Sequence, residues 1–296
     1  MSLTSFINYL SHEKNYSLHT IRAYERDIID FSTFCSTTYR LDTIEEVPYT
    51  LVRNWIVSLV DKKISNRSIN RKVASLKAYY KFLHRIERIQ INPLAKHIAL
   101  KTSKKVDVPF SETEMNDVLL QLPTDGSFES VRDLLIIELF YTTGIRRAEL
   151  IHIKPHDVDI LNRTLKVVGK RNKERIIPLL PSTAHLFSKY IEARNNLNSI
   201  VDVEYIFLLK SGYKMYETLV YRIINSYFSK VSSKSKRSPH ILRHTFATHL
   251  LNMGADLNSV KELLGHSSLA STQVYTHSGI AELMKVHSAT HPRSKK

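Results

Sequence analysis

The 296-residue chain contains a single cysteine, Cys35, and no run of eighteen apolar residues. One cysteine cannot form an internal disulfide and is a poor metal ligand alone, so we expect Cys35 to be a small core residue. The absence of a long apolar run excludes a membrane-spanning helix. The first residues also lack the basic stretch and apolar core of a signal peptide, which favours a cytoplasmic protein.

Acidic residues are outnumbered, 28 against 43 basic ones, and the formal net charge is +15. Residues 62–105 carry thirteen Lys or Arg and one acid, Glu87, whereas residues 1–61 have a net charge of −3. Basic side chains gathered on one segment are typical of proteins that bind a polyanion, because each neutralised phosphate releases counterions. Nucleic acid is the leading candidate. A solvated helix face and attraction to anionic lipid are the alternatives.

Apolar side chains recur at helical spacing in residues 17–34, 51–60 and 66–85, which predicts a helical N-terminal domain at 1–91. The apolar stripe of the last segment consists of Ile69, Val73, Leu76, Tyr80 and Leu83. Five basic side chains lie largely off that stripe and are the candidates for contact with nucleic acid: Arg67, Arg71, Lys72, Lys77 and Lys81.

The helical pattern stops after residue 91. Asn92-Pro93 ends the last helix, and the polar run 101–105 has no hydrophobic period, so we interpret 92–110 as an interdomain linker. Ser111 and Glu114 have the spacing of a capping box, which predicts that a helix begins there. A second domain is expected at 111–277.

This second domain is predicted to be mostly helical with a small β-hairpin. We expect, in chain order, an apolar helix over 134–141 ended by Gly144, strands over 164–168 and 175–178, a helix from Pro181, a short strand over 205–208 and a helix over 219–231. Lys170 would lie at the hairpin tip. The fold class is therefore mainly α with a small β-hairpin or sheet, in two domains.

His240 and Arg243 are three positions apart after Pro239, a residue suited to the first turn of a helix. Both side chains would emerge near the positive end of the helix dipole, where an anion is stabilised. A charge-assisted contact from a guanidinium to phosphate contributes about 1.5–3 kcal/mol. The alternative is that Arg243 pairs with a buried acid and His240 is a capped core histidine.

Metal binding is a further possibility, since His240 and His244 are four positions apart and His249 follows. Arg243 beside them would repel a cation, the glutamate of an H-E-x-x-H motif is absent, and the second domain has no cysteine. We therefore expect neither a metal nor another cofactor.

Tyr275 lies nine residues after His266, the last residue of the sequence L-G-H. A phenol has an ordinary pKa of about 10 and needs neighbouring cations or a base to attack phosphorus at neutral pH. Arg146, Lys170 and the basic residues of 240–243 are candidates to supply them. The sequence has no acidic cluster that would hold a divalent ion instead.

Five motifs between residues 142 and 277 resemble, in order and separation, those of the tyrosine site-specific recombinases. They are T-G-I-R-R-A-E-L, G-K-R-N-K-E-R-I-I-P-L, S-P-H-I-L-R-H-T-F-A-T-H-L, L-G-H-S-S and S-T-Q-V-Y-T-H. In the N-terminal domain, S-L-H-T-I-R-A-Y and N-R-K-V-A-S-L-K-A-Y-Y-K-F-L look like the core-binding domain of that family. The compact length and the final K-V-H-S-A-T-H-P-R look most like the bacterial chromosomal Xer recombinases.

The resemblance implies that Arg146 and Arg243 clamp the non-bridging oxygens of the scissile phosphate and stabilise its pentacoordinate transition state. It implies that His266 hydrogen-bonds the same phosphate. Neither ATP nor metal is required, because the energy of the broken phosphodiester is kept in a covalent protein–DNA bond.

The resemblance also implies that Tyr275 is the nucleophile that forms a 3′-phosphotyrosyl bond, with His240 assisting removal of its proton. Lys170 would protonate the departing 5′ oxygen. The chain departs from the family at Arg171, where glycine is common, which puts the approach of Lys170 in doubt and makes Lys173 the substitute candidate.

The implied architecture is a C-shaped clamp around duplex DNA, with the linker setting its reach. A tail helix at 278–296, with Ile280, Leu283, Met284 and His287 at helical spacing, would dock into a neighbouring protomer. The assembly would be a homo- or hetero-tetramer with a related recombinase on two DNA sites, with a DNA translocase as a further partner and no membrane. The alternative is that the tail folds back on its own domain.

The function expected from these features is site-specific DNA recombination through a Holliday junction, serving chromosome dimer resolution at cell division in the nucleoid. An integrase of a mobile element is the alternative within the same chemistry. A sequence-specific or architectural DNA-binding protein is the alternative that is not an enzyme, and it would leave the six candidate catalytic residues unexplained.

Overall fold

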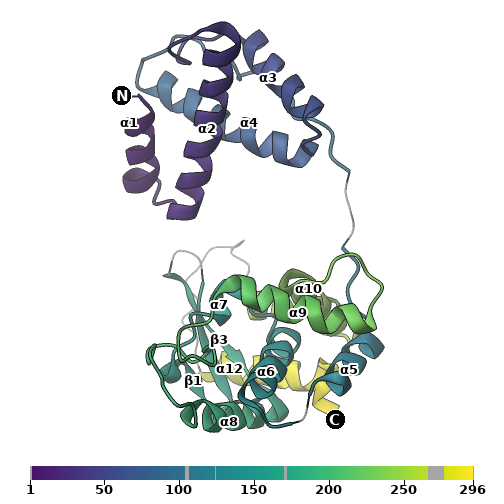
Figure 1. Cartoon of the computed structure of the whole chain (residues 1–296). Coiled ribbons are helices and arrows are strands. Elements are labelled where there is room, and N and C mark those ends of the chain that lie inside the picture. Colours follow the sequence, from purple (N-terminus) through teal and green to yellow (C-terminus); the bar gives the residue numbers. More distant parts are fainter. Residues whose placement is uncertain (1, 104–106, 124, 170–171, 266–276, 296) are drawn as a thin grey trace. The chain divides into compact units, whose positions relative to one another are not determined.

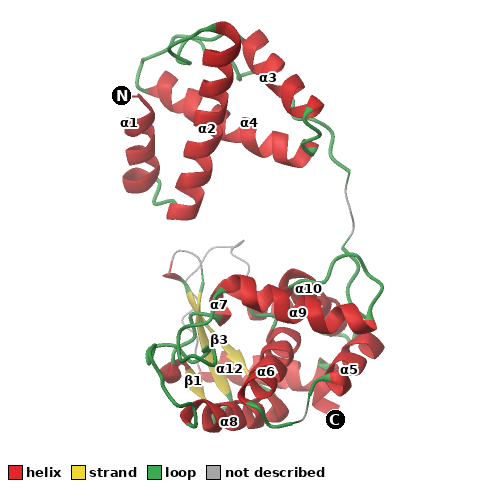
Figure 2. Cartoon of the chain, viewed as in Figure 1, coloured by secondary structure: helices red, strands yellow, loops and turns green. Residues whose placement is uncertain are grey.

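The computed structural model describes residues 2–103, 107–123, 125–169, 172–265 and 277–295. The chain forms two compact units, unit 1 at Met1–Lys105 and unit 2 at Val106–Lys296 (Figure 1). Most regular structure is helical, and the sheet lies in unit 2 (Figure 2). The predicted mainly helical fold with a small sheet is therefore confirmed. None of the helices in the described part of the chain combines the length and apolarity that a bilayer crossing requires.

Unit 1 is a helical bundle. Its elements are α1 (Ser2–Asn8), the π turn η1 (Tyr9–Glu13), α2 (Leu18–Tyr39), α3 (Tyr49–Asp61) and α4 (Asn66–Arg85). The two longest helices begin at serines, because the hydroxyls of Ser17 and Ser65 accept the amide hydrogens of Thr20 and Ser68 at 3.3 Å. The three helices predicted in this unit are present.

The predicted apolar stripes form the core of unit 1. All five stripe residues of α4 are buried, as are Ile21, Ile28 and Phe31 of α2. Cys35 is also buried, which raises the pKa of its thiol to about 11 and confirms it as a core residue. Trp55 of α3 packs edge-on against Phe31.

The first part of the predicted linker is fixed to α4. Leu94 is buried, and the side chain of Asn70 bonds both the amide and the carbonyl of Leu100, at 2.9 and 2.8 Å. Asn66 Nδ2 donates to the carbonyl of Lys101 at 2.8 Å. The segment is therefore hydrogen-bonded to unit 1 as far as Lys101.

Unit 2 is built around α6, which is buried along almost its whole length. Its elements are α5 (Glu112–Gln121), α6 (Phe128–Thr143), α7 (Arg147–Leu150), η2 (Pro155–Asp157), β1 (Val158–Asp159), β2 (Thr164–Val168), β3 (Glu174–Pro178), α8 (Pro181–Asn195), α9 (Glu217–Val231), α10 (Pro239–Asn252), α11 (Leu257–Leu264), α12 (His277–Thr290) and η4 (Pro292–Lys295). A helix that is buried on all sides lies in the middle of a core, and α8, α9 and α10 pack against α6. The capping box of Ser111 and Glu114 is present at the start of α5.

The sheet is antiparallel in the order β1-β2-β3, with Leu165 paired with Ile177. The predicted hairpin is confirmed, whereas β1 has only two residues and gave no periodic signal. The short strand expected at 205–208 was wrong: the segment forms only an isolated bridge between Leu208 and Lys214. The hydroxyl of Tyr190 satisfies backbone groups that a strand would pair: it donates to the carbonyl of Ile206 and accepts the amide hydrogen of Leu208.

The C-terminal segment packs on unit 2 itself. Leu283 is buried in a cluster with Phe246 and Leu264, and α12 contacts α11 and β3. His287 is buried as well, while the side chain of Ile280 lies outside the described residues. This arrangement matches the alternative in which the tail folds back, and docking into a neighbour stays a prediction.

Candidate active site

The guanidinium groups of Arg146 and Arg243 converge on the C-terminal end of α11. Arg243 donates to the carbonyls of Leu264 and Gly144, both at 2.6 Å. Arg146 donates to the carbonyl of Gly265 at 3.2 Å. Two residues that are 97 positions apart in the sequence, on α10 and just before α7, are therefore held by neighbouring carbonyls of one helix end.

The local backbone explains this meeting point. The last carbonyls of a helix have no helical partners and carry a partial negative charge, which attracts cations. Gly144 and Gly265 end α6 and α11 in the left-handed conformation, at φ +58° and +65°. A Cβ at Gly144 would come within 2.5 Å of Phe246 and one at Gly265 within 2.9 Å of Arg175, so neither position accepts a side chain without rearrangement.

Glu149 and Arg175 hold Arg146 in place. Glu149 accepts hydrogen bonds from the Arg146 side chain at 2.6 Å and from its backbone amide at 2.9 Å. Arg175, on β3, binds both oxygens of Glu149 at 2.9 Å and the carbonyl of Leu263 at 3.1 Å. Burial alone would raise the pKa of Glu149, but the hydrogen bonds and charge of Arg175, with the backbone and side-chain hydrogen bonds from Arg146, lower this pKa to about 2.

Sequence reasoning missed Glu149 and Arg175. The spacing of Glu149, three positions after Arg146 at the start of a helix, is that of a capping box and could have signalled its contact with the Arg146 amide. Arg175 gave no local signal, since its partners lie 26 and 88 positions away.

The cluster carries more positive than negative charge. Burial, together with the charges of Arg146 and Arg175, lowers the pKa of Arg243 to about 9. One carboxylate, Glu149, stands against three guanidinium groups, and the side chain of Arg146 is 35% exposed. A partly open group of cations with this surplus favours an anion that can accept several charge-assisted hydrogen bonds, which a phosphate does.

His240 lies in the first turn of α10, directly after Pro239, and its side chain is exposed. The alternative of a core histidine is therefore not what the structure shows, and Arg243 binds carbonyls rather than a buried acid. Asp107 lies nearby: the hydrogen bond from Lys236 lowers the pKa of Asp107, and the charges of His240 and His244 lower it further.

The side chain of His249 lies in the core, unlike the exposed side chain of His240. It is buried, its Nε2 lies 2.9 Å from the carbonyl of Phe110, and its Nδ1 lies 3.0 Å from the hydroxyl of Tyr141. Both ring nitrogens are thus occupied, which leaves none for a metal in the arrangement that the spacing suggested.

Three predicted catalytic residues, Lys170, His266 and Tyr275, lie outside the described residues. Of their sequence neighbours, Gly265, which precedes His266, accepts a hydrogen bond from Arg146 at 3.2 Å. Gly169, which precedes Lys170, donates its amide hydrogen to the carbonyl of Lys173 at 2.7 Å within the hairpin. The side chain of Lys173, the substitute candidate, is exposed.

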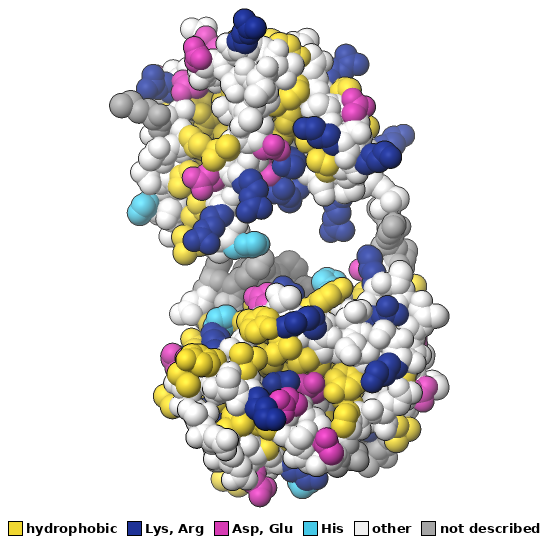
Figure 3. Space-filling model, in the orientation of Figure 1, with side chains coloured by type: hydrophobic (Ala, Val, Ile, Leu, Met, Phe, Trp, Pro, Cys, Tyr) yellow, Lys and Arg dark blue, Asp and Glu magenta, His cyan; other side chains and the backbone are white. Residues whose placement is uncertain are grey.

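The five basic candidates on α4 divide into two sets. Arg71 binds both oxygens of the buried Asp27 at 2.6 and 2.9 Å, and Lys72 pairs with Asp30 at 2.7 Å. The other three are exposed and make no ion pair among the described residues: Arg67, Lys77 and Lys81. Lys and Arg side chains gather along one side of unit 1 (Figure 3).

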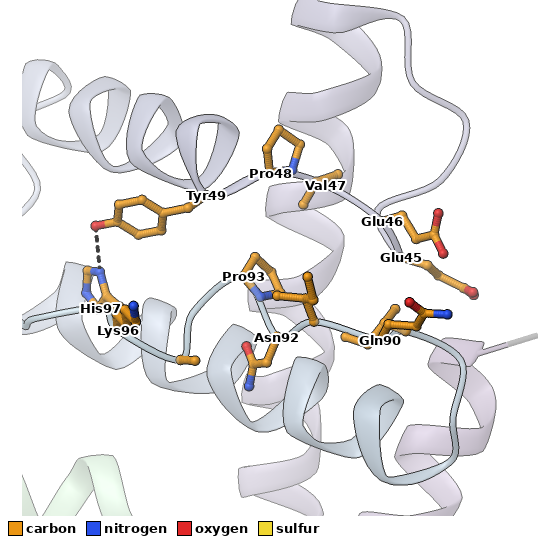
Figure 4. A pocket seen from close by; sticks show the side chains of 13 residues that line it. Glu45, Glu46, Val47, Pro48, Tyr49, Gln90, Asn92, Pro93, Lys96 and His97 are labelled. Carbon is orange, nitrogen blue, oxygen red and sulfur yellow. Dashed lines mark hydrogen bonds between the residues drawn. The ribbon is translucent and has the colours of Figure 1, made fainter.

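A cavity of about 660 Å³ lies in unit 1 between the loop before α3 and the segment after α4 (Figure 4). Its lining is mainly apolar, with Glu45 and Glu46 at one end and a hydrogen bond of 3.1 Å between the Tyr49 hydroxyl and His97 at the other. None of the candidate catalytic or nucleic-acid-binding residues that the structure describes lines this cavity.

Solved structures share this fold. The XerH site-specific recombinase, in a post-cleavage complex with palindromic difH substrate, is 20% identical with a TM-score of 0.73 over 97% of this chain and 84% of that one. The Tn1549 transposon integrase, in complex with circular intermediate DNA, is 22% identical with a TM-score of 0.71 over 96% of this chain and 98% of that one.

Sequence relatives are closer. The tyrosine recombinase XerC of Chlorobaculum parvum is 37% identical, covering 98% of this chain and 94% of its own, and XerC of Staphylococcus aureus is 35% identical, covering 99% and 97%. Residues 110–282 match the phage integrase family and residues 3–87 match its N-terminal SAM-like domain. The chain therefore belongs to the phage integrase family of DNA strand transferases, as a tyrosine recombinase of the XerC type.

Proposed function

We propose that the chain is a site-specific recombinase that cleaves one DNA strand through Tyr275 and rejoins it to another. The observation that carries the proposal is the meeting of Arg146 and Arg243 at one helix end, with a surplus of positive charge. A phosphate that entered there would accept hydrogen bonds from the remaining N–H groups of both guanidinium groups, while the backbone carbonyls keep the side chains in position.

In the proposed reaction the hydroxyl oxygen of Tyr275 attacks the scissile phosphorus while the bond to the 5′ oxygen breaks. His240, exposed in the first turn of α10, takes the phenol proton, and Lys170 gives a proton to the leaving 5′ oxygen. The two arginines neutralise the charge that develops on the non-bridging oxygens, and His266 donates to one of them. A 5′ hydroxyl of a second strand then attacks the phosphotyrosyl bond and regenerates Tyr275.

Duplex DNA is the proposed partner. Support comes from the recombinases of the same fold, which were solved with DNA, and from the unpaired basic side chains of α4. We propose that unit 1 and the catalytic unit close on DNA as a clamp, and that two DNA sites are held by a homo- or hetero-tetramer. In that assembly the tail at 278–296 would leave its own unit and pack against the corresponding residues of a neighbouring protomer, including Phe246 and Leu264.

The proposed biological role is resolution of chromosome dimers, as the near full-length similarity to XerC proteins favours. The integrase of a mobile element is the second candidate, favoured by the fold shared with a transposon integrase. Mapping the sites that the protein occupies on the host chromosome distinguishes them: one site near the replication terminus supports the first, and sites confined to the ends of a mobile element support the second.

The chemistry is tested with a nicked suicide DNA substrate, on which a recombinase becomes trapped as a covalent adduct. Tyr275→Phe should bind DNA like the wild type and form no adduct. The matched control is Tyr213→Phe, an exposed tyrosine of the same unit that should keep full adduct yield. Adduct formation by the Tyr275 variant would refute the nucleophile assignment, and absence of adduct from the wild type would refute the function.

A further inference from the structure

Asp27, on α2, is a buried carboxylate that is bound by three side chains of α4. Its own side chain is 1% exposed. Oδ1 and Oδ2 accept hydrogen bonds from Arg71 at 2.9 and 2.6 Å, and Oδ2 also accepts one from the Ser75 hydroxyl at 2.7 Å. Lys72 Nζ lies 3.5 Å from Oδ1. A buried charge is stable only with such partners, so Asp27 and the side chains that bind it have fixed positions.

The contact with Asp27 uses only part of the guanidinium group of Arg71. Arginine has five N–H donors in a rigid plane, and Asp27 takes one from Nη1 and one from Nη2. The Nε–H and the second hydrogen of Nη2 point the same way along another edge of that plane. Among the described residues, Nε of Arg71 has no hydrogen-bond acceptor, and the side chain is 53% exposed. Arg71 therefore offers a second pair of donors to a ligand.

The charges around Asp27 cancel one another. Two cations, Arg71 and Lys72, are paired with two acids, Asp27 and Asp30, and Asp30 lies 2.7 Å from Lys72 Nζ. Arg67, one helical turn before Arg71, is exposed and makes no ion pair within the described ranges. The basic face of α4 thus has a part with surplus positive charge and a neutral part in which Arg71 is held.

Surplus charge and fixed donors recognise different parts of DNA. Net positive charge binds phosphates, which contributes affinity without sequence information. A base edge is recognised by donors at fixed positions: O6 and N7 of guanine lie side by side in the major groove and accept two N–H groups of one arginine. An arginine that is already held in place also loses little conformational entropy on binding. The neutralised charge and the free edge of Arg71 therefore fit guanine better than phosphate.

We infer that Arg71 reads a guanine in the DNA target, and that Asp27 is the positioning residue that holds Arg71 for this contact. The inference rests on the proposed function only in that the chain binds duplex DNA. The unpaired basic side chains of α4 contribute affinity for any sequence, whereas Arg71 contributes preference for one. The buried carboxylate makes this difference, because it keeps Arg71 from acting as one more phosphate contact.

The test measures base preference by selecting bound duplexes from a pool of randomised sequence, which requires no knowledge of the target. Arg71→Gln keeps a side-chain N–H that can donate to Asp27, but an amide matches adenine rather than guanine. Arg67→Gln is the same change on an exposed arginine one turn earlier and is the matched control. Asp27→Asn keeps the shape of the side chain and frees the charge of Arg71, and urea unfolding checks that this variant is folded.

The wild type should prefer guanine at one position of the selected sequences, and Arg71→Gln should lower that preference by at least about fivefold and keep the others. Arg67→Gln should keep every preference, weaken binding to all sequences and lower the slope of log K against log salt by about 1. Asp27→Asn should lose the same guanine preference and make the slope steeper by about 1, because a freed cation binds a phosphate.

Uniform weakening by Arg71→Gln with unchanged preferences would identify Arg71 as a phosphate contact and overturn the inference. A wild type without base preference would overturn it as well. A folded Asp27→Asn variant that keeps both the preference and the slope would remove the role of Asp27. Base preference needs no strand cleavage, so the adduct assay with Tyr275→Phe tests the proposed function separately: a chain that forms adduct but fails here keeps that function and loses only this inference.

Discussion

Arg175 binds Glu149 with two parallel hydrogen bonds of 2.9 Å, in a pair whose side chains are only 6% and 3% exposed. Because Glu149 also holds the backbone and side chain of Arg146, the pair connects the hairpin strand β3 to the candidate phosphate site. A residue of the hairpin thus helps to orient an arginine that precedes it by 29 positions.

Replacing Arg175 with methionine should therefore lower the free energy of unfolding and slow the proposed reaction. Breaking a buried pair by removing one partner leaves an uncompensated charge and costs about 3–5 kcal/mol in free energy of unfolding. Urea unfolding measures this loss, and the matched control is Arg147→Met, whose pair with Glu217 is well exposed and should cost at most about 1 kcal/mol. An equal loss in the two variants would show that Arg175 has no special structural role.

DNA binding should distinguish two lysines of α4. Lys77 is exposed, whereas the side chain of Lys72 is 15% exposed and lies 2.7 Å from Asp30. Lys77→Ala should weaken binding to all sequences and lower the slope of log K against log salt by about 1. Lys72→Ala should change that slope less, because the charge that it removes is already paired. Equal effects on the slope would show that Lys72 leaves its acids to meet the DNA.

The elements that could be predicted from the sequence are those with local causes. Gly144 ends a helix because of its own conformational freedom, the capping box of Ser111 and Glu114 spans three residues, and the α4 stripe repeats within one helix. The basic face of α4 was less predictable. Spacing showed that Arg71 lies off the apolar stripe, but not that Asp27, 44 positions earlier, would bind it.

The same distinction, between local causes and contacts of residues far apart in the sequence, applies to the candidate site. Arg146 and Arg243 could be identified from their motifs. That both side chains bind carbonyls at the end of α11 could not, because this contact joins residues far apart in the sequence. Arg175 was missed for the same reason. Lys170, His266 and Tyr275 lie outside the described residues and stay predictions from the resemblance.

Mild acid should destabilise unit 2 through the tail histidines. Burial lowers the pKa of His287 to about 4, and burial with the charge of His287 lowers that of His291 to about 3, while His249 is shifted in the same direction. In the unfolded chain these groups titrate near about 6.5, so below that pH the unfolded state binds more protons. Their contribution is complete above pH 6.5 and is lost as the pH falls toward about 4 and about 3.

The expected slope in this range is up to about 1.4 kcal/mol per pH unit for each histidine. Urea unfolding between about pH 6.5 and 5 measures this slope. Glu149 and Glu114, with pKa values of about 2, change the pH dependence of stability only at lower pH. The variant with His287→Gln and His291→Gln should show a flatter dependence. An identical pH dependence in variant and wild type would mean that these histidines do not titrate on unfolding.

Deleting residues 278–296 should leave DNA binding largely intact and abolish strand exchange, because the basic face of α4 is untouched while the tail's contacts are lost. The deletion removes Leu283 from its cluster with Phe246 and leaves the carbonyls of Tyr141 and Thr142 without donors, so unit 2 should also lose stability. A deletion of 294–296 only, which keeps Arg293 and both histidines, is the control and should behave like the wild type. Binding is measured by titration of labelled DNA, and exchange by the yield of recombinant product. Because α12 and η4 take no part in the proposed bond-making steps, unchanged recombination after the long deletion would exclude any role of the tail, in its own unit or in a neighbour.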